Sequence, residues 1–273
     1  MVRKEQSHSM IRNSKWDKFK KKLYARIAYN ALARVHSKTT NQLKMLNLGI
    51  AVEDQLKPAL KAEDESERLQ FQLYYILLNK LDIAGKHVLE IGCGVGGGCY
   101  YMQEYFKPAR ITGIDLIKRH IVLANQYFGN RDIKFIAADA CEYAMSPASV
   151  DVVVDLESSH LYPDFARYVQ RTYQVLKPGG YFTFADMRVV EHFDELERIF
   201  SIQGFNLIYQ KDISDQVQQS IDQNQQRIGF ILGHVPFGNL LFRNFSFSHG
   251  SAYYEAFKRR EWIFKHYILQ KPF

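Results

Sequence analysis

The stretch at residues 87–97, HVLEIGCGVGG, constrains the fold of this chain more than any other. A short apolar run ends near Glu90 and leads into three glycines spaced G-x-G-x-x-G, at Gly92, Gly94 and Gly97. Glycines at this spacing permit a tight turn from a strand into a helix and the close approach of a ligand to the backbone. The stretch therefore predicts the first strand and loop of a doubly wound sheet that binds a nucleotide-like ligand.

Downstream of this loop, short apolar runs alternate with patterns of helical periodicity, which is typical of a mostly parallel sheet covered by helices. The predicted strands are 87–91, 110–115, 133–138, 150–156 and 180–186, followed by the apolar stretch 205–210 and a closing strand at 261–270. Helices are expected at about 96–107, 117–128, 163–176 and 191–203. The run VDVVVDL at 150–156 is apolar enough for a central strand. We expect an α/β, Rossmann-like fold with seven strands, the last of them antiparallel.

Two regions lie outside this alternation. Residues 1–84 are predicted to form a helical N-terminal cap that includes a helix at 65–81, which leaves 85–273 as the core domain. Within the core, residues 212–258 are rich in Gln, Asn, Phe and His and are predicted to form a helical insertion before the last strand. Its aromatic side chains suit the wall of an apolar cavity, and packing within the insertion explains them equally well.

The positive charge of the chain is concentrated near its start. The net charge is +7, but residues 1–44 hold twelve Lys or Arg against Glu5 and Asp17, so the remainder carries no positive excess. Residues 10–35 have the periodicity of a basic amphipathic helix, interpreted as a cap with a solvated lysine face, a peripheral contact with an anionic membrane, or a nucleic-acid contact. Because the core lacks a basic excess, we do not expect a nucleic-acid partner.

Composition favours a cytoplasmic protein of 273 residues, peripheral to a membrane at most. We find no apolar run of about 18 residues and no apolar signal sequence at the N-terminus. Cys93, Cys99 and Cys141 have no zinc spacing, so we expect packing cysteines and no metal. The oligomeric state, monomer or homodimer, stays open.

Carboxylates at three predicted strand ends indicate which ligand the glycine loop holds. Glu90 would repel a pyrophosphate and attract a ligand with an ammonium and a sulfonium group. Asp115 can accept hydrogen bonds from both ribose hydroxyls, and Asp139 is placed to meet an adenine amino group. A cationic amino acid, a ribose and an adenine together describe S-adenosylmethionine, with S-adenosylhomocysteine as its product. The residues expected to contact it are Glu90, Gly92, Cys93, Gly94, Asp115, Leu116, Asp139, Ala140 and Leu156.

A family resemblance points the same way. The segments VLEIGCGVGGG, GIDL, ADA, VDVVVDLESSHLYPD and LKPGGYFTFAD resemble class I S-adenosylmethionine-dependent methyltransferases over about residues 85–190. Within that group, HLYPDF, the LKPGGYF turn and KPARITGIDL are similar to bacterial phthiotriol dimycocerosate methyltransferases. The resemblance implies methyl transfer to a small molecule.

His160 follows the fourth predicted strand, at the sheet edge where ligands bind in such folds, and is the expected general base. Asp186 ends the fifth strand at the same edge and could hold the imidazole in the required tautomer. In the alternative interpretation the two side chains only cap a loop and a helix. We expect O-methylation of a hydroxyl on a small, apolar acceptor such as a lipid or polyketide alcohol. N-methylation of a small amine, and a non-catalytic S-adenosylmethionine-binding protein, are the other hypotheses.

Overall fold

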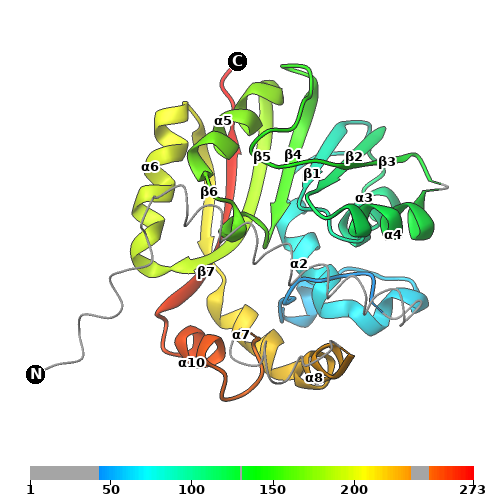
Figure 1. Ribbon diagram of the computed structural model, residues 1–273, viewed down its shortest axis with the longest axis vertical. Coiled ribbons are helices and arrows are strands. Elements are labelled where there is room, and N and C mark those ends of the chain that lie inside the picture. The colour runs from blue at the N-terminus through cyan, green and yellow to red at the C-terminus, as the bar shows by residue number, and fades with distance from the viewer. Residues whose placement is uncertain (1–42, 130, 235–245) are drawn as a thin grey trace, which may run out of the picture.

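The computed structural model describes residues 43–129, 131–234 and 246–273, and its centre is one mixed sheet of seven strands (Figure 1). The strands lie in the order β3-β2-β1-β4-β5-β7-β6. Their bounds are β1 His87–Ile91, β2 Arg110–Asp115, β3 Ile133–Ala137, β4 Val150–Leu156, β5 Leu176–Val189, β6 Asn206–Asp212 and β7 Trp262–Gln270. The predicted Rossmann-like fold is confirmed, and β4 is the central strand as its apolar sequence predicts.

Strand direction confirms the second part of the prediction. β1 pairs in parallel with β2 and β4, β2 with β3, and β4 with β5, whereas β7 runs antiparallel to both β5 and β6. The carboxyl ends of β1 to β5 therefore meet at one edge of the sheet, and the loops that follow them are neighbours.

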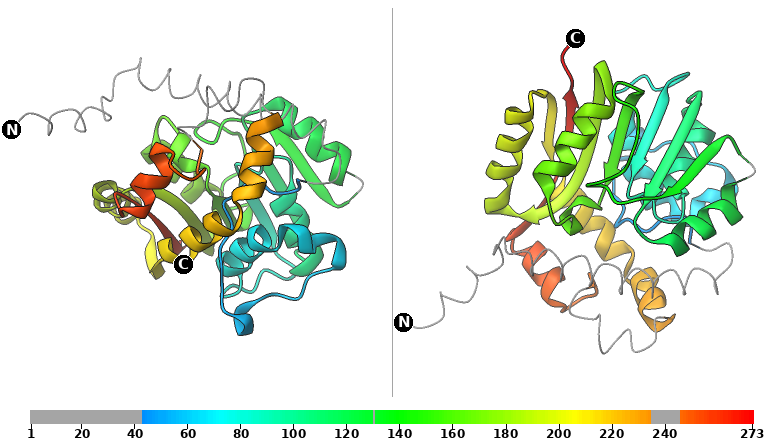
Figure 2. Two further views of the ribbon diagram at one scale, coloured as in Figure 1. Left: turned by 90° about the horizontal axis from the view of Figure 1, so that it is seen from below. Right: turned by 45° about the horizontal axis from the view of Figure 1, so that its top comes forward.

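Helices cover both faces of the sheet (Figure 2). Their bounds are α2 Arg68–Leu78, α3 Gly97–Tyr105, α4 Lys118–Phe128, α5 Phe165–Val175, α6 Phe193–Gln203, α7 Ser214–Gln223, α8 Gln225–His234 and α10 Ala252–Lys258. One apolar cluster joins the sheet to α2, α3, α4 and α7, and a second joins the opposite face to α5 and α6. Val153 and Val154 are both buried but belong to different clusters, because successive side chains of a strand point to opposite faces.

Local sequence explains where several helices begin and end. Asp164 precedes α5 and accepts a hydrogen bond from the Arg167 amide, and Ser251 does the same for Tyr254 at the start of α10. At its other end α6 stops at Gly204, whose φ of 93° is strained for a residue with a side chain. These caps fix the lengths of the helices beside β5 and β7.

One expectation from the sequence is wrong in its bounds. β5 is longer than the predicted strand at 180–186: it begins at Leu176, which pairs with Val150, and extends to Val189, because β7 pairs with it as far as that residue. The LKPGGYF turn interrupts its pairing with β4, since the register shifts between the pairs Val150–Leu176 and Val152–Tyr181. His120 of α4 is buried, with its side chain 1% exposed, and its Nδ1 lies 3.2 Å from Asp115 Oδ1. Buried imidazole needs such a partner, and the ribose-binding candidate supplies it.

Residues 44–48, called the strap below, cross the glycine loop. Glu67 accepts hydrogen bonds from the Lys44 and Met45 amides, and the Leu48 amide donates to Glu157 at 3.0 Å. The insertion also holds the strap, since Arg227 donates to the Met45 carbonyl and Ser220 to the Leu48 carbonyl. The strap is thus bonded to the core and to the insertion at once.

The insertion packs at the carboxyl end of the parallel strands, where Figure 1 shows α7, α8 and α10 together below the sheet. Phe247 and Tyr254 are buried there, so at least these aromatic residues contribute to packing. The predicted helix at 10–35 and the aromatic residues at 237, 242 and 245 lie outside the described residues. No helix in the described ranges is long and apolar enough to cross a membrane.

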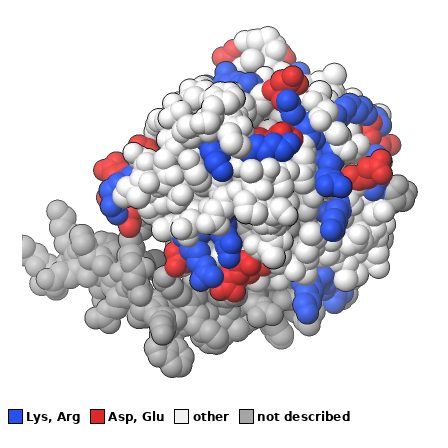
Figure 3. All heavy atoms as spheres, turned by 90° about the horizontal axis from the view of Figure 1, so that it is seen from above, with Lys and Arg blue, Asp and Glu red and all other residues white. Residues whose placement is uncertain are grey.

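The opposite end of the sheet carries charges of both signs. Figure 3 shows this face, with Lys and Arg side chains beside Asp and Glu. Lys177 and Asp151, at the start of β5 and β4, form one such pair at 2.7 Å. Mixed charges of this kind agree with the absence of a positive excess in the core sequence.

The close approach of the strap to α3 can be tested at Gly97. A Cβ there would lie 2.0 Å from the Lys44 carbonyl oxygen, so Gly97→Ala must displace the strap backbone. We expect it to lower the free energy of unfolding by about 1–3 kcal/mol in urea titrations. Gly229→Ala is the matched control: no atom lies within 4 Å of its Cβ, so in the helix it should stabilise by about 0.5–1 kcal/mol. Equal stabilities for Gly97→Ala and the parent chain would contradict this packing.

Candidate active site

The register of the parallel strands brings the sequence-predicted cofactor residues to one edge. Ile91 at the end of β1 pairs with Ile114 of β2 and with Asp155 of β4, and Asp115 pairs with Ala137 of β3. The residues that follow these pairs include Gly92, Asp139 and Leu156. They are therefore level with one another, as a ligand lying across the strand ends requires.

Asp115 ties the glycine loop to the second strand. Its Oδ2 accepts a hydrogen bond from the Gly94 amide at 2.9 Å, and its Oδ1 accepts one from the Ile117 amide at 2.7 Å. Gly92 and Gly94 have φ values of 74° and 54°, which glycine adopts without strain. The conformation of the loop is thus fixed by its glycines and by the Asp115 carboxylate. The same carboxylate can also accept a hydrogen bond from a ligand hydroxyl.

Glu90 faces the helices that cover β1. Its two carboxylate oxygens accept hydrogen bonds from the Tyr74 hydroxyl at 2.5 Å and the Cys99 thiol at 2.8 Å. Burial raises the pKa of Glu90 to about 7, although both hydrogen bonds oppose that shift. In this arrangement Glu90 joins β1 to α2 and α3, and its attraction of a cationic ligand stays a prediction.

The other residues predicted to contact the cofactor lie at the ends of the same strands. Asp139 follows β3 and accepts a hydrogen bond from the Cys141 amide, which closes the turn after that strand. Cys93, Ala140 and Leu156 are buried at the strand ends, and Leu116 is half-buried. Cys93, Cys99 and Cys141 are all buried and form no disulfide in the described part of the chain, as expected of packing cysteines. The ligand contacts of these residues stay predictions.

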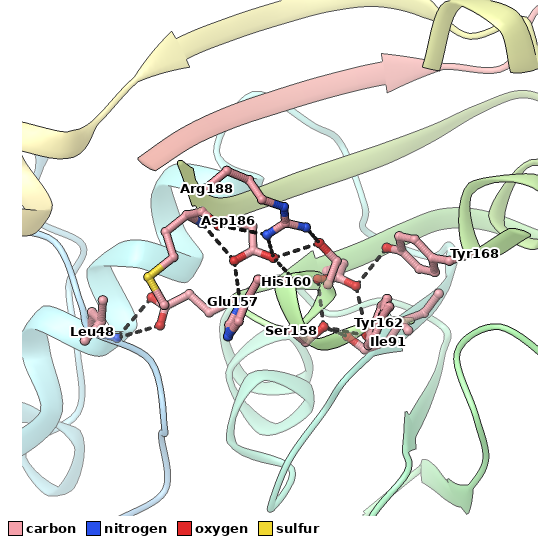
Figure 4. Close-up of polar contacts among 12 residues, drawn as sticks. Leu48, Ile91, Glu157, Ser158, His160, Tyr162, Tyr168, Asp186 and Arg188 are labelled. Carbon is pink, nitrogen blue, oxygen red and sulfur yellow. Dashed lines mark hydrogen bonds and ion pairs between the residues drawn. The ribbon is translucent and has the colours of Figure 1, made fainter. Parts of the chain in front are cut away.

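His160 and Asp186 are in direct contact (Figure 4). The Nδ1 atom of His160 lies 2.8 Å from Asp186 Oδ1, and the His160 amide donates to Oδ2 at 2.8 Å. Because a carboxylate only accepts hydrogen bonds, this contact fixes the proton on Nδ1 and leaves Nε2 as the proton-accepting nitrogen. The side chain of His160 is 18% exposed, whereas that of Asp186 is fully buried. A proton acceptor held at the carboxyl edge of the sheet is the result.

Arg188 completes this group and was missed by the sequence analysis. Its guanidinium lies 2.8 Å from Asp186 Oδ2 and donates to the Ser159 hydroxyl at 2.6 Å. Burial alone would raise the pKa of Asp186, but the charge of Arg188 and the contacts with His160 and Ser159 hold it well below its usual range. Arg188 lies two residues after Asp186 in the same strand and so points to the same face, which is the signal that the sequence offers.

Asp155 provides a second buried carboxylate, on the strand next to that of Asp186. Asp155 of β4 accepts hydrogen bonds from Tyr168, Ser158 and Tyr162, at 2.7, 2.8 and 3.2 Å. Burial, and then the charge of Asp186, raise its pKa to about 7. Ser158 in turn packs against Gly92, where a Cβ would lie only 2.4 Å from the serine hydroxyl. Asp155 thereby fixes the loop after β4 against the glycine loop.

Glu157 has a left-handed backbone conformation. Its φ is 53°, which is uncommon for a residue with a side chain, and such residues cluster at functional sites. Burial raises the pKa of its carboxyl group to about 8, against the hydrogen bond from the Leu48 amide. This conformation turns the carboxyl group toward the strap, as Figure 4 shows.

Known methyltransferases resemble this chain in sequence over most of its length. Residues 89–184 match the family model described as "Methyltransferase domain". The chain is 30% identical to the fatty-acid O-methyltransferase of Mycolicibacterium smegmatis, over 92% of this chain and 93% of that protein. It is 31% identical to the phthiotriol/phenolphthiotriol dimycocerosates methyltransferase of Mycobacterium leprae, over 70% and 71% of the two chains.

Among solved structures, the [4+2]-cyclase SpnF superposes with a TM-score of 0.70 at 15% sequence identity, covering 91% of this chain and 95% of its own. At this identity the likeness shows the fold alone. A cyclase on the same fold illustrates that the reaction must be argued from the site.

Stability should depend on pH through Glu157. Its folded pKa of about 8 exceeds the ordinary value of 4.5, so the native state keeps a proton that the unfolded chain releases between those pH values. Stability from this group is therefore present at low pH and is lost as pH rises toward 8. Glu157→Gln mimics the protonated form. We expect its free energy of unfolding, measured in urea titrations, to rise relative to that of the parent chain by about 2–4 kcal/mol from pH 5 to pH 8. Exposed Glu195→Gln is the control, and parallel stability curves for Glu157→Gln and the parent would refute the raised pKa.

Proposed function

Since this chain belongs to the class I S-adenosylmethionine-dependent methyltransferases, we propose that it methylates a hydroxyl group of a small apolar acceptor. The observation that carries the proposal is the contact between His160 and Asp186, which leaves a proton-accepting nitrogen at the carboxyl edge of the sheet. A hydroxyl acceptor needs such a base, because its oxygen must lose a proton as it gains the methyl group.

The residues at the strand ends fit the cofactor. Gly92 and Gly94 form a loop without side chains beside Asp115, and the turn at Asp139 lies at the end of the next strand. Asp115 would hold the ribose hydroxyls and Asp139 would meet the adenine. Glu90 and Glu157 would accept hydrogen bonds from an ammonium group, whose charge would favour their ionised forms. When bound, S-adenosylmethionine supplies an activated methyl group on a sulfonium centre.

The protein's own part in the reaction is alignment and proton removal. The acceptor hydroxyl would donate its proton to His160 Nε2 while the oxygen–carbon bond forms and the carbon–sulfur bond breaks. Asp186 keeps the imidazole in the required tautomer and orientation and stabilises the imidazolium that results. We place the apolar part of the acceptor beneath the insertion, which comprises residues 212–258. We also propose that residues 1–84 form a helical cap over the core domain, residues 85–273.

The names of the relatives support a lipid acceptor. One relative is a fatty-acid O-methyltransferase and aligns with nearly the whole chain, and the other acts on phthiotriol dimycocerosates. The first relative also favours a second candidate, the carboxyl group of a fatty acid. A carboxylate is already ionised at neutral pH and needs no base, so the two acceptor classes should differ in how much they depend on His160.

N-methylation of a small amine remains a competitor of this proposal and would also require little from His160. The family model and the methyltransferase relatives speak against the other hypothesis, a non-catalytic binding protein. We keep a monomer or homodimer, a cytoplasmic location and a peripheral membrane contact through residues 10–35 as predictions. Co-sedimentation with anionic vesicles at low and high salt tests the membrane contact.

The cofactor assignment predicts the behaviour of Asp115→Ala. Loss of the carboxylate removes both its contact with the Gly94 amide and its bond to a ribose hydroxyl, so S-adenosylmethionine affinity should fall by roughly tenfold or more, about 1.5–3 kcal/mol per lost charged hydrogen bond. Isothermal titration calorimetry measures this, with Asp132→Ala, an exposed aspartate before β3, as the control. Unchanged affinity in Asp115→Ala would sink the assignment.

The base assignment predicts a split between acceptor classes in His160→Ala. Turnover of a long-chain alcohol should fall roughly 10²–10⁴-fold, whereas turnover of a fatty acid should change far less. His192→Ala, a half-buried histidine before α6, is the control. If alcohol turnover in His160→Ala stayed near that of the parent chain from pH 6 to pH 9, a range that brackets the ordinary histidine pKa, His160 would not be the base.

A further inference from the structure

We propose that Arg188 is a positioning residue whose positive charge balances that of Asp186, so that the buried carboxylate orients His160 without holding a proton on its second nitrogen. The part of this inference that concerns turnover rests on the proposed function. The part that concerns the charge state of His160 stands on the contacts of the two strand ends alone.

Arg188, Asp186 and His160 form one hydrogen-bonded network together with the Ser159 hydroxyl. Asp186 Oδ2 receives the guanidinium of Arg188 at 2.8 Å, the Ser159 hydroxyl at 2.7 Å and the His160 amide. Its Oδ1 receives the Met187 amide and the His160 ring nitrogen, both at 2.8 Å. Both carboxylate oxygens thus accept hydrogen bonds, and the bond to the His160 ring is one of five such contacts.

Charge decides what this bond does to the imidazole. A buried carboxylate with no cation beside it would favour the imidazolium, in which Nε2 carries a proton and cannot accept another. Arg188 places its guanidinium on the far side of the same carboxylate and makes the pair neutral as a whole. The imidazole then gains a fixed tautomer from Asp186 without the full attraction of a negative charge.

The other charged groups near the pair do not replace Arg188. The charge of Asp186 raises the pKa of both Asp155 and Glu157, and by the same repulsion an ionised carboxyl group at either residue disfavours negative charge on Asp186. Burial holds the pKa of Asp155 at about 7 and that of Glu157 at about 8, so much of their charge is absent at neutral pH. When ionised, both would favour the imidazolium, which increases the need for a cation at this point.

The geometry of Arg188 suits this task. Its side chain is 13% exposed, so water screens its charge little. Its Nη1 atom contacts Asp186 and donates to the Met187 carbonyl, and its Nη2 atom donates to the Ser159 hydroxyl. The guanidinium also lies 5.6 Å from the ring centre of Phe165. Ser159 immediately precedes His160, so the side chain of Arg188 also holds the turn that presents the imidazole.

Two variants separate charge from shape. Arg188→Gln removes the charge and keeps a hydrogen-bond donor, whereas Arg188→Lys keeps the charge and loses the planar fork. The first measurement is the NMR titration of the His160 ring, assigned with His160→Gln, in protein without acceptor. We expect its midpoint to move up by roughly one pH unit in Arg188→Gln, the lower end of the effect of a nearby charge, and to stay near the parent value in Arg188→Lys. Arg198→Met, which removes an exposed charge on α6, should leave it unchanged.

The second measurement is the pH profile of turnover with a long-chain alcohol. Its acid limb should move up by the same amount in Arg188→Gln, which means about tenfold less turnover on that limb and recovery at higher pH. A shifted ring titration with an unshifted rate profile supports the role of Arg188 and removes His160 as base, so the two failures are distinguishable. A ring titration in folded Arg188→Gln that is unmoved or moves down overturns the inference. So does an Arg188→Lys titration that moves up by a full unit, which remains decisive if Arg188→Gln does not fold.

Discussion

The candidate site depends on the buried, ionised carboxylate of Asp186, the first residue of β5 beyond its pairing with β4. Asp186 has no exposed surface, and a charge so placed is tolerated only when it is paired and fully hydrogen-bonded. Its donors come from the strand itself, through Met187 and Arg188, and from the turn after β4, through Ser159 and His160. The carboxylate therefore joins the ends of two central strands and fixes the direction of the imidazole.

The two buried aspartates of the site have opposite character. Asp155 receives hydrogen bonds from hydroxyl groups, and burial raises its pKa, whereas Asp186 receives a guanidinium and keeps a pKa below its usual range. Neighbouring carboxyl groups whose environments separate their pKa values can take different roles. Here one fixes loops through neutral hydrogen bonds and the other carries the charge that a base requires.

Sequence pattern predicts the parts of this protein that depend on periodicity and strand order. The end of β2 at Asp115 follows from an apolar run, and so does the place of Asp186 at the same edge of the sheet, although β5 continues to Val189. Side-chain direction is a different matter: nothing local to Glu90 indicates that Tyr74 and Cys99 bind its carboxylate, since Tyr74 comes from a helix earlier in the chain. The positive φ of Glu157 is likewise set by the strap and the pairing of β4, so it could not be predicted from its neighbours in sequence.

The strap has a consequence for the diversification of such enzymes. Its Met45 carbonyl is bonded by Arg227 of α8, its Leu48 carbonyl by Ser220 of α7, and its Leu48 amide by Glu157 after the central strand. An insertion transplanted from a relative to change the acceptor would lose the first two bonds unless the segment at 44–48 came with it. Segments separated by more than 170 residues in the chain therefore form one exchangeable module, and recombination that respects this module keeps the glycine loop covered.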